Sequence, residues 1–509
     1  MGDVLPADYL TERRGALRRA WGALVLALAC LSSACVLHRH RPVKDASIQV
    51  TVGGAASVPE SAPAPRPPGQ APRQDSLRRA SRGSLEGSPG PVLAEELRAR
   101  TFDVAWRRVR DGFYDPAMGG VNWDSIGEVF RPQALAAEHS GPFHEVLARM
   151  LATLGVSHTV VLSPERLAAE SAREPGWTGA EVRRVEGDWV VFRVVPGSPA
   201  AKAGLRTGDV VDSIAGRSAE DIARAGDRPW LRPNESLRAT TAAVNEWLAG
   251  NRGLTVYVVA RDTLDRARPL EMKAAPYPGP SVRIGSLPPA RATLEARRLE
   301  GGWGYLRFST FVPALRGRIE EAVRGLGNAP GLIIDLRGNP GGYDALGDRL
   351  AALIMPEPHV LTETKTRHGT RTDRERPDEH GFRGPVAVLL DGLSASASEQ
   401  FAAPMQELQR VIVVGERSAG ADLEAAVVTL PTGGALMYPA GQPRTPAGRV
   451  IEGAGVAPDV EAQLSRRDLA RGHDDQLDAA VAALEKLAPT GTASGHSHRW
   501  HGIPIPHRR

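Results

Sequence analysis

Apolar and polar positions alternate in two different ways along the first half of the chain. Between Leu93 and about Ala172, large apolar residues recur at helical spacing, which predicts a small helical domain; they are Phe102, Val104, Trp106, Val109, Phe113, Phe143, Val146, Leu147 and Leu151. From Gly176 to about Pro276, short alternating runs at 189–194 and 254–259 lie between Gly and Pro turns. This second pattern predicts a domain of short strands.

A third pattern begins at Gly302 and continues to about Leu464. Wholly apolar runs predict buried strands, at 304–308, 332–336, 386–390 and 411–414. Helical stretches separate these runs, as expected for strands joined by crossover connections, so the fold class is α/β within a multidomain chain. Ligands usually bind at the carboxyl ends of such strands, so the turns that follow them are candidates for a functional site.

Three serines follow the run at 386–390, in the segment Asp-Gly-Leu-Ser-Ala-Ser-Ala-Ser-Glu at 391–399. A helical stretch comes next, so these hydroxyls would lie at a helix amino end. Free backbone N–H groups and the helix dipole stabilise negative charge there, which suits a serine nucleophile and its oxyanion. The alternative, from these residues alone, is that the serines only cap the helix.

A glycine turn follows the run at 332–336, in Gly-Leu-Ile-Ile-Asp-Leu-Arg-Gly-Asn-Pro-Gly-Gly at 331–342. Glycines let a backbone approach a ligand closely, and their N–H groups could point at a tetrahedral oxyanion. A phosphate-binding loop is the competing interpretation, but the Gly-Lys-Ser/Thr ending of such loops is absent.

Together the two turns resemble those of the tricorn and C-terminal-processing serine peptidase superfamily. The resemblance implies a crotonase-like α/β core with Ser396 as the nucleophile. It also implies an oxyanion hole formed by the backbone N–H groups of Ala397 and of Gly341 or Gly342.

A serine needs a base, and the superfamily resemblance offers two. The processing branch uses a lysine in Gly-Lys-Gly-Thr after a strand that ends in Gly-Glu. Here the strand and Gly-Glu at 415–416 are present, but Ala421 stands where the lysine would fall. The Ser-Lys pair is therefore missing.

The tricorn-like branch uses a histidine from the helical segment, in a Leu-Gly-x-Ser-His context that matches residues 154–158. By this resemblance His158 is the general base, since imidazole titrates near neutral pH. Ser157 resembles the neighbouring serine that helps hold the catalytic network. Glu452, in Glu-Gly-Ala-Gly-Val-Ala-Pro-Asp at 452–459, matches the orienting carboxylate.

Residues 196–211, beginning Pro-Gly-Ser-Pro-Ala-Ala, resemble the core signature of a PDZ domain of the bacterial protease type. Such domains bind extended peptides by adding a strand to a sheet edge. Trp177, Thr178 and Gly179 stand where the carboxylate-binding loop would be. Because they differ from the usual small apolar form, the domain could instead gate or brace the active site.

The chain begins with the layout of an export signal: arginines, an apolar stretch at 20–31, then small residues. Both cysteines, Cys30 and Cys35, lie in it, so the mature domains would carry no disulfide. The sequence at 32–35 resembles a lipoprotein cleavage box, which predicts a membrane tether through lipidation of Cys35. A cleaved soluble signal and an uncleaved helix are the alternatives.

These patterns predict seven segments, in this order: an export or lipoprotein signal at 1–36; a disordered Pro/Ser/Ala-rich linker at 37–92; the helical domain carrying His158 at 93–172; the PDZ-like domain at 173–278; a linker at 279–300; the α/β peptidase core with a C-terminal helix at 301–488; and a disordered tail at 489–509.

The sequence therefore predicts a serine endopeptidase of the cell envelope, on its periplasmic or extracellular face, acting on peptides or unfolded proteins. We expect no cofactor and no metal, because the histidines of the tail lack Cys or carboxylate partners. A net charge of +4 without a basic stripe does not indicate nucleic acid as a partner. The alternatives are a catalytically silent peptide-binding envelope protein and a Ser-Lys peptidase with an unrecognised base.

Overall fold

A computed structural model describes residues 89–487. The predicted signal, its lipidation site Cys35, nearly all of the 37–92 linker and the 489–509 tail lie outside these residues. Within 89–487, no helix is long and apolar enough to cross a membrane.

The first segment is helical, as its periodicity predicted. Its elements are α3 (Glu95–Gly112), η1 (Met118–Gly120), α4 (Trp123–Ala136), α5 (Ser140–Ala152), β1 (Val160–Leu162) and α6 (Pro164–Ala172). In α3 the buried stripe includes Phe102, Ala105 and Val109, and Glu95 and Glu96 occupy the first turn, where the helix dipole favours negative charge. Asn122 caps α4 by accepting a hydrogen bond from the backbone N–H of Ser125.

The second segment is a β-rich domain with three helices. Its elements are β2 (Gly176–Trp177), β3 (Ala180–Val185), β4 (Asp188–Val194), α7 (Pro199–Lys202), β5 (Val210–Ile214), β6 (Arg217–Ser218), α8 (Ala219–Gly226), α9 (Pro233–Ala249), β7 (Thr255–Arg261), β8 (Ala267–Lys273) and β9 (Ala275–Pro276). The main sheet has the order β3-β4-β5-β7-β8, with β6 on β5. Its core includes Val191, Ile214 and Val258 from strands and Val244 and Leu248 from α9.

The third segment is built on a six-stranded sheet of order β12-β13-β14-β17-β18-β21. The strands are β12 (Leu294–Arg298), β13 (Gly304–Phe308), β14 (Leu332–Asp335), β17 (Val386–Leu390), β18 (Ile412–Gly415) and β21 (Val460–Glu461). All neighbours are parallel except β12 and β13. The α/β class is confirmed, with the four predicted apolar runs at or within one residue of β13, β14, β17 and β18.

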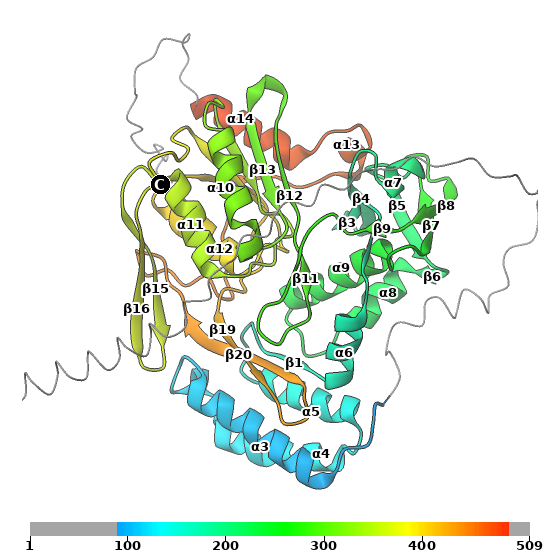
Figure 1. Cartoon of the computed structure of the whole chain (residues 1–509), viewed down its shortest axis with the longest axis vertical. Coiled ribbons are helices and arrows are strands. Elements are labelled where there is room, and N and C mark those ends of the chain that lie inside the picture. Colours follow the sequence, from blue (N-terminus) through cyan, green and yellow to red (C-terminus); the bar gives the residue numbers. More distant parts are fainter. Residues whose placement is uncertain (1–88, 488–509) are drawn as a thin grey trace, which may run out of the picture. The chain divides into compact units, whose positions relative to one another are not determined.

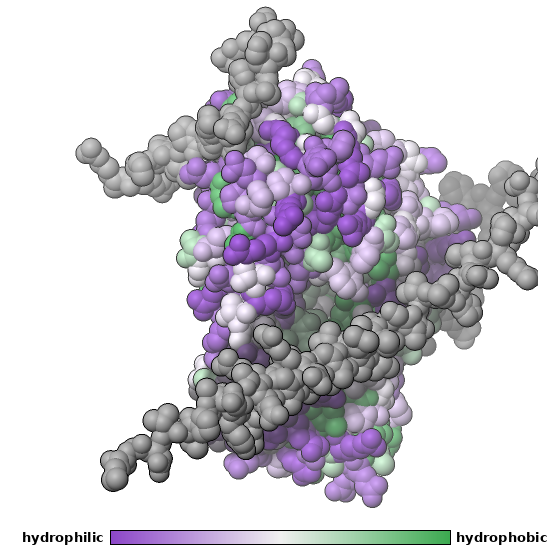
Figure 2. All heavy atoms as spheres, turned by 60° about the vertical axis from the view of Figure 1, so that its left-hand side comes forward, coloured by the Kyte–Doolittle hydropathy of each residue, from purple (hydrophilic) through white to green (hydrophobic). Residues whose placement is uncertain are grey.

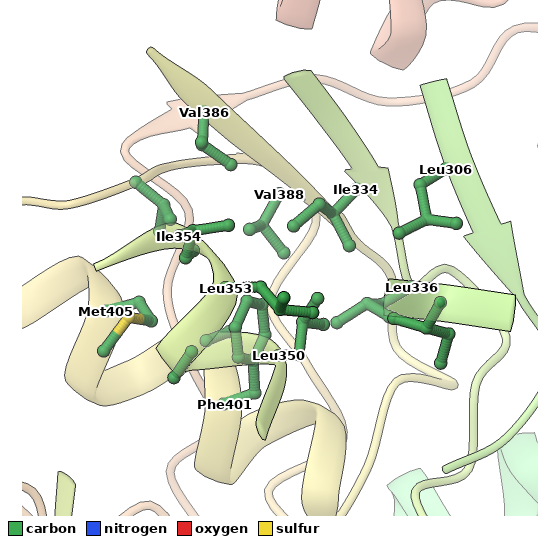
Figure 3. Close-up of a cluster of buried hydrophobic side chains, with 14 of the residues drawn as sticks. Leu306, Ile334, Leu336, Leu350, Leu353, Ile354, Val386, Val388, Phe401 and Met405 are labelled. Carbon is green, nitrogen blue, oxygen red and sulfur yellow. The ribbon is translucent and has the colours of Figure 1, made fainter. Parts of the chain in front are cut away.

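Helices cover both faces of this sheet (Figure 1). The helices of this segment are η2 (Glu300–Gly302), η3 (Pro313–Leu315), α10 (Arg316–Gly325), α11 (Asp344–Ile354), α12 (Ala397–Glu407), α13 (Arg466–Ala470) and α14 (Asp475–Leu487). Of these, α13 packs through Leu469 against the β-rich domain and does not cover the sheet. Leu306, Ile334 and Val388 point toward Leu350 and Phe401 of α11 and α12 (Figure 3). The alternate strand residues, among them Ile333 and Leu389, pack against Ala480 and Leu484 of α14. Burial on both faces explains why these strands are apolar throughout.

The predicted linker at 279–300 contains three strands. Two of them, β10 (Ser281–Val282) and β11 (Ala290–Arg291), pair with each other, and β12 pairs with β13 of the core sheet. The core therefore begins before residue 301. The apolar pattern missed β12 because it is an edge strand whose last three residues, 296–298, are exposed and mostly charged.

A second sheet joins the helical segment to the core. It has the order β1-β20-β15-β16, with β19 on β20, from the strands β15 (His359–Thr366), β16 (Gly369–Glu375), β19 (Glu424–Thr429) and β20 (Ala435–Gln442). Leu423, Leu430 and Leu436 from this region share one apolar core with Phe102 and Phe143. The pairing of β1 with β20 fixes the residues just before β1, including His158.

The outer surface is mostly hydrophilic on the face shown in Figure 2, with apolar residues scattered among polar ones. The large apolar residues that are exposed in the described part of the chain are few and dispersed in the sequence: Val92, Val129, Leu254, Tyr257, Leu264 and Tyr343. Scattered exposure of this kind is ordinary for a folded protein, so the surface gives no separate indication of function.

Candidate active site

Ser396 is the N-cap residue of α12, directly after the turn that leaves β17. Its backbone is in the left-handed region, with φ 54° and ψ −124°, where a residue with a Cβ is strained. A strained serine on a sharp strand-to-helix turn is the arrangement that exposes a nucleophile at a helix amino end. Its backbone N–H donates to Ala421 O at 2.8 Å.

Glu399 holds the nucleophile turn against the loop at 418–421. This fully buried carboxylate accepts hydrogen bonds from the backbone N–H groups of Ser396, Gly420 and Ala421 and from the Ser418 hydroxyl, at 2.5–3.1 Å. Four donors satisfy a buried carboxylate well. The role of Glu399 was not predicted from the sequence, although it stands in the same motif.

The glycine turn lies against Ser396. A Cβ placed on Gly341 would lie 2.7 Å from Ser396 Cβ and 2.9 Å from Ala397 N, and the residue has φ +95°, so only glycine fits there. The N–H of Gly341 donates to Asn339 Oδ1 at 2.9 Å. The carbonyl of Gly341 accepts from Phe311 N at 2.8 Å and from the Thr310 hydroxyl at 2.7 Å.

Two backbone N–H groups beside Ser396 remain available as donors. Within residues 89–487, the N–H groups of Gly342 and Ala397 donate to no protein acceptor. They come from the two turns predicted to form the oxyanion hole. Of the predicted pair Gly341 and Gly342, therefore, Gly342 has the free donor.

His158, Ser157 and Glu452 form one hydrogen-bonded group. The Ser157 hydroxyl donates to Glu452 Oε2 at 2.7 Å and lies 2.7 Å from His158 Nδ1. The Ser157 N–H donates to Glu452 Oε1 at 2.8 Å. The structure thus joins three of the predicted site residues, with Ser157 between the histidine and the carboxylate.

These contacts determine which nitrogen of His158 carries the proton. The one proton of the Ser157 hydroxyl goes to Glu452, so Ser157 Oγ can only accept from His158 Nδ1. Nδ1 is then protonated, and Nε2 has a free lone pair with which to accept a proton. Within the described residues no hydrogen bond joins His158 to Ser396, and such bonds often tighten only when substrate binds.

Burial, followed by the positive charges of Arg238 and Arg232, lowers the pKa of His158 to about 3. Its imidazole is therefore neutral at physiological pH, the form that a general base needs. His158 also has φ +61°, another strained backbone position at the site.

Glu452 has two further partners that the sequence did not reveal. Arg232, the N-cap residue of α9, donates to Glu452 Oε1 at 3.1 Å. The backbone N–H of Asp422 donates to Glu452 Oε2 at 2.9 Å. Since Ala421 O accepts from Ser396, the 421–422 peptide links the nucleophile turn to the carboxylate.

A second arginine of the β-rich domain reaches the nucleophile turn. Arg183 of β3 donates to Asp391 Oδ2 at 3.1 Å, and Asp391 Oδ1 accepts from the N–H groups of Gly338 and Leu393 at 2.8 and 3.1 Å. Asp391 therefore fixes both turns of the site at once. Arg183 gave no signal in the sequence, because nothing marks a strand arginine as a partner of a distant turn.

No lysine of the described chain stands in for the absent Ser-Lys base. Ala421 is buried beside Ser396, at the place where the lysine would fall. Lys365 pairs with Asp115 at 3.3 Å. Among residues 89–487 there is also no group of three His, Cys, Asp or Glu residues that could hold a metal ion.

The predicted peptide-binding residues of the β-rich domain lie in a tightly packed corner. Trp177 is in β2, which pairs with β9. Thr178 is 1% exposed and its hydroxyl donates to Leu248 O at 3.0 Å, and a Cβ on Gly179 would lie 2.3 Å from Ser198 Cβ. The Thr178 side chain therefore serves packing, whereas Trp177 is part-buried.

Three parts of the chain match known protein families. Residues 94–152 match the tricorn protease C1 domain, residues 190–228 a PDZ domain and residues 302–462 peptidase family S41. These matches fall on the helical segment, the β-rich domain and the core with its two turns.

Curated relatives come from both branches of the superfamily. A tricorn protease homolog of Streptomyces coelicolor is 28% identical over 437 residues, covering 78% of this chain and 33% of the relative. Carboxyl-terminal-processing peptidase 3 of Arabidopsis thaliana is 26% identical over 398 residues, covering 76% of this chain and 73% of the relative. The chain thus spans a third of the tricorn homolog and about three quarters of the plant peptidase.

The fold is also shared with solved structures. Mature CPAF, solved in complex with lactacystin, has a TM-score of 0.51 and 14% identity, covering 77% of this chain and 98% of the other. One chain thus carries matches to a tricorn C1 domain, a PDZ domain and peptidase family S41, and its relatives are named for both tricorn and carboxyl-terminal-processing peptidases, which supports a serine peptidase.

Proposed function

We propose that this chain is a serine endopeptidase that works through an acyl-enzyme at Ser396, with His158 as its general base. The observation that carries the proposal is the hydrogen-bonded group of Glu452, Ser157 and His158. This group keeps the proton of the neutral imidazole on Nδ1, so Nε2 can accept a proton. The match to peptidase family S41 supports the peptidase reaction, and the alanine at 421, where the lysine would fall, favours the histidine over a lysine base.

Each proton has a defined place in this reaction. The Ser396 hydroxyl oxygen attacks the carbonyl carbon of the peptide bond while its proton passes to Nε2 of His158. The N–H groups of Gly342 and Ala397 donate to the oxyanion that forms. When the C–N bond breaks, His158 returns the proton to the leaving amine, and an ester to Ser396 remains. Water, deprotonated in turn by His158, hydrolyses this ester and restores the serine.

Ser157, Glu452 and Arg232 act as positioning residues in this scheme. As Nε2 takes up the proton, the imidazole becomes positive, and the Glu452 charge, transmitted through Ser157, stabilises it. Arg232 fixes the carboxylate from the other side, at 3.1 Å. Neither Glu452 nor Arg232 contacts the reacting atoms.

A fluorophosphonate probe tests the proposal on the purified full chain. We expect wild type to be labelled at Ser396, and labelling to be lost in Ser396→Ala and to fall about 1,000-fold or more in His158→Ala. His473→Ala, a change of an exposed histidine in the same chain, is the matched control and should label at the wild-type rate. Circular dichroism of each variant would show that the fold is retained.

The other outcomes point to the two alternatives. Labelling of His158→Ala at the wild-type rate would indicate another base and exclude the Ser-His scheme. A folded wild-type chain that stays unlabelled, even with peptide added, would indicate a silent peptide-binding protein.

We further propose that the chain acts in the cell envelope, tethered through Cys35. The arginine-apolar-small layout at 13–34 supports export, and the sequence at 32–35 supports lipidation. We expect the wild type to incorporate palmitate and to be found in the membrane fraction. We expect Cys35→Ser to incorporate no palmitate. If the wild-type protein were found in the cytosolic fraction and carried no palmitate, both the export and the lipid tether would be contradicted.

A further inference from the structure

The core sheet ends in an open strand, β12. It pairs with β13 on one side, and within residues 89–487 no strand pairs with its other side (Figure 1). At the two ends of β12, Thr293 O accepts from Ser309 N–H at 3.1 Å and Leu299 N–H donates to Trp303 O at 2.8 Å. Backbone groups turn to alternate sides along a strand, so residues 295 and 297 also face β13, whereas 294, 296 and 298 face outward.

The outward backbone groups of β12 have no partner. In the described part of the chain, the N–H and C=O groups of Leu294, Ala296 and Arg298 form no hydrogen bond. Ala296, Arg297 and Arg298 are also exposed, so this edge is open to solvent. A row of unpaired backbone groups is a template on which another strand can pair.

The other long edge strands of residues 89–487 are less suited to a partner strand. In β3, the Asn245 side chain of α9 already bonds the N–H and the C=O of Val182, at 2.9 and 3.1 Å. In β8, Pro269 has no N–H to donate. β16 contains no apolar residue, so a strand bound there would bury little apolar surface.

β12 differs from these strands because a groove of about 380 Å³ lies beside it, on the side of α10. The strand contributes Leu294 and Ala296 to the lining, and α10 contributes Arg318, Glu321, Ala322 and Gly325. The small residues leave room for side chains of a partner strand. A partner would therefore gain apolar burial in addition to backbone hydrogen bonds.

The charges along β12 favour a second copy of the same strand as that partner. Glu295 and Arg297 lie on the face away from the groove, and Arg297 donates to Glu295 at 2.8 Å. If two β12 strands pair antiparallel about Ala296, Glu295 of each copy lies opposite Arg297 of the other. These are non-hydrogen-bonded positions, where side chains come closest. Pairing centred on residue 295 or 297 would instead put two glutamates or two arginines opposite each other.

We propose that β12 pairs antiparallel with β12 of a second copy of this chain, centred on Ala296, and joins the two core sheets into one. Residues 294, 296 and 298 of each copy then each donate one hydrogen bond to the other copy and accept one. The paired segment is short, so the dimer should dissociate on dilution. The proposal does not depend on the peptidase reaction.

Sedimentation equilibrium of the purified full chain tests the proposal. We expect the average mass of the wild type to rise with concentration from one chain mass toward two. Ala296→Pro removes an N–H that has no partner within the chain, so the fold should remain while the dissociation constant rises about 10-fold or more. Arg108→Glu changes an exposed residue of α3 and should dimerise like the wild type.

Two charge reversals test the register of the pairing. Glu295→Arg and Arg297→Glu each put like charges opposite each other in a dimer of identical copies, so each variant alone should dimerise on the order of 10-fold more weakly. A mixture of the two variants restores opposite charges at every facing pair, so we expect dimers to return. Mixing cannot repair a misfolded variant, so this rescue separates pairing from folding.

Three results would overturn the proposal. In the first, the wild type stays monomeric at the highest concentration reached. In the second, the dimer is unchanged by Ala296→Pro, which would place the contact on another surface. In the third, the two charge variants dimerise no better together than alone, which would exclude the antiparallel pairing about Ala296.

Discussion

At the scale of single residues, the proposed base His158 would determine how the labelling of Ser396 depends on pH. Burial, followed by the charges of Arg238 and Arg232, lowers its pKa to about 3, whereas an ordinary histidine is half protonated near pH 6.5. Only the neutral form accepts a proton, so the base is competent above the lowered pKa. We expect the labelling rate of Ser396 to keep its plateau down to about pH 5. If the labelling rate of the wild type fell by half near pH 6.5, His158 would not have this lowered pKa.

Gly341 has room for no side chain. In Gly341→Ala the new Cβ would collide with Ser396 Cβ and Ala397 N, and the left-handed backbone would be strained. We expect peptidase activity to fall roughly 100-fold or more because the oxyanion donors move.

Gly317 of α10 is the matched control for Gly341. A Cβ there meets nothing within 4 Å, and the residue is helical. Gly317→Ala should keep full activity and add about 0.5–1 kcal/mol of stability, measured by urea unfolding. If both alanine variants kept full activity, the close approach of the glycine turn would not matter for catalysis.

The sequence led to Ser396, His158, Ser157 and Glu452 through short motifs, and the structure places the last three in hydrogen-bond contact. It did not lead to Glu399, Arg232 or Asp422 as partners of the site. Their contacts join positions such as 232 and 452, 220 residues apart, and no local pattern records such a pair. Short motifs led to the residues predicted to react, whereas the contacts that hold these residues in place depend on the complete fold.

At the scale of elements, α11 carries an electrostatic cost. Asp344 and Asp348 are four residues apart on one helix face, and both have a pKa raised to about 7, mainly by burial. The folded state thus binds more protons than the unfolded state between about pH 4 and pH 7. Stability contributed by this helix is therefore lost as pH rises through that range.

Asp348→Asn should relieve this cost. We expect the variant to be more stable than wild type by about 1–2 kcal/mol at pH 8.5 and nearly equal to it at pH 4. Thermal unfolding at the two pH values is the measurement. Equal melting temperatures at pH 8.5 would show that Asp348 is well solvated and carries no such cost.

Strands buried on both faces were predictable from their apolar runs, but the strands of the second sheet were not. In β16, for example, residues 369–372 are exposed, and β15 mixes Thr, Glu and Lys with two apolar residues. Such strands lack both a continuous apolar run and a clean alternation. Their pairing comes from hairpin geometry and from packing against the helical segment.

At the scale of the whole molecule, the β-rich domain takes part in the active site through its arginines. Arg183 binds Asp391, which fixes both site turns. We expect Arg183→Met to lower kcat on the order of 10–100-fold, with little change in the KM of a small substrate, because the turns lose their common partner.

Arg184 provides the comparison for Arg183. It is the next residue of β3, points to the other face and pairs with the exposed Glu220 at 2.6 Å. Arg184→Met should therefore retain kcat. Equal kcat values for the two methionine variants would mean that the domain does not support the turns through Arg183.

The contact between Ser157 and Glu452 joins positions 295 residues apart in the chain. During synthesis, a ribosome would therefore release the nucleophile and then the carboxylate long after the histidine has emerged. No incomplete chain can hold His158 in the proton-accepting tautomer by this route. The proposed catalytic group is consequently complete only after residue 452 has been synthesised, so a chain that stops before it lacks the orienting carboxylate.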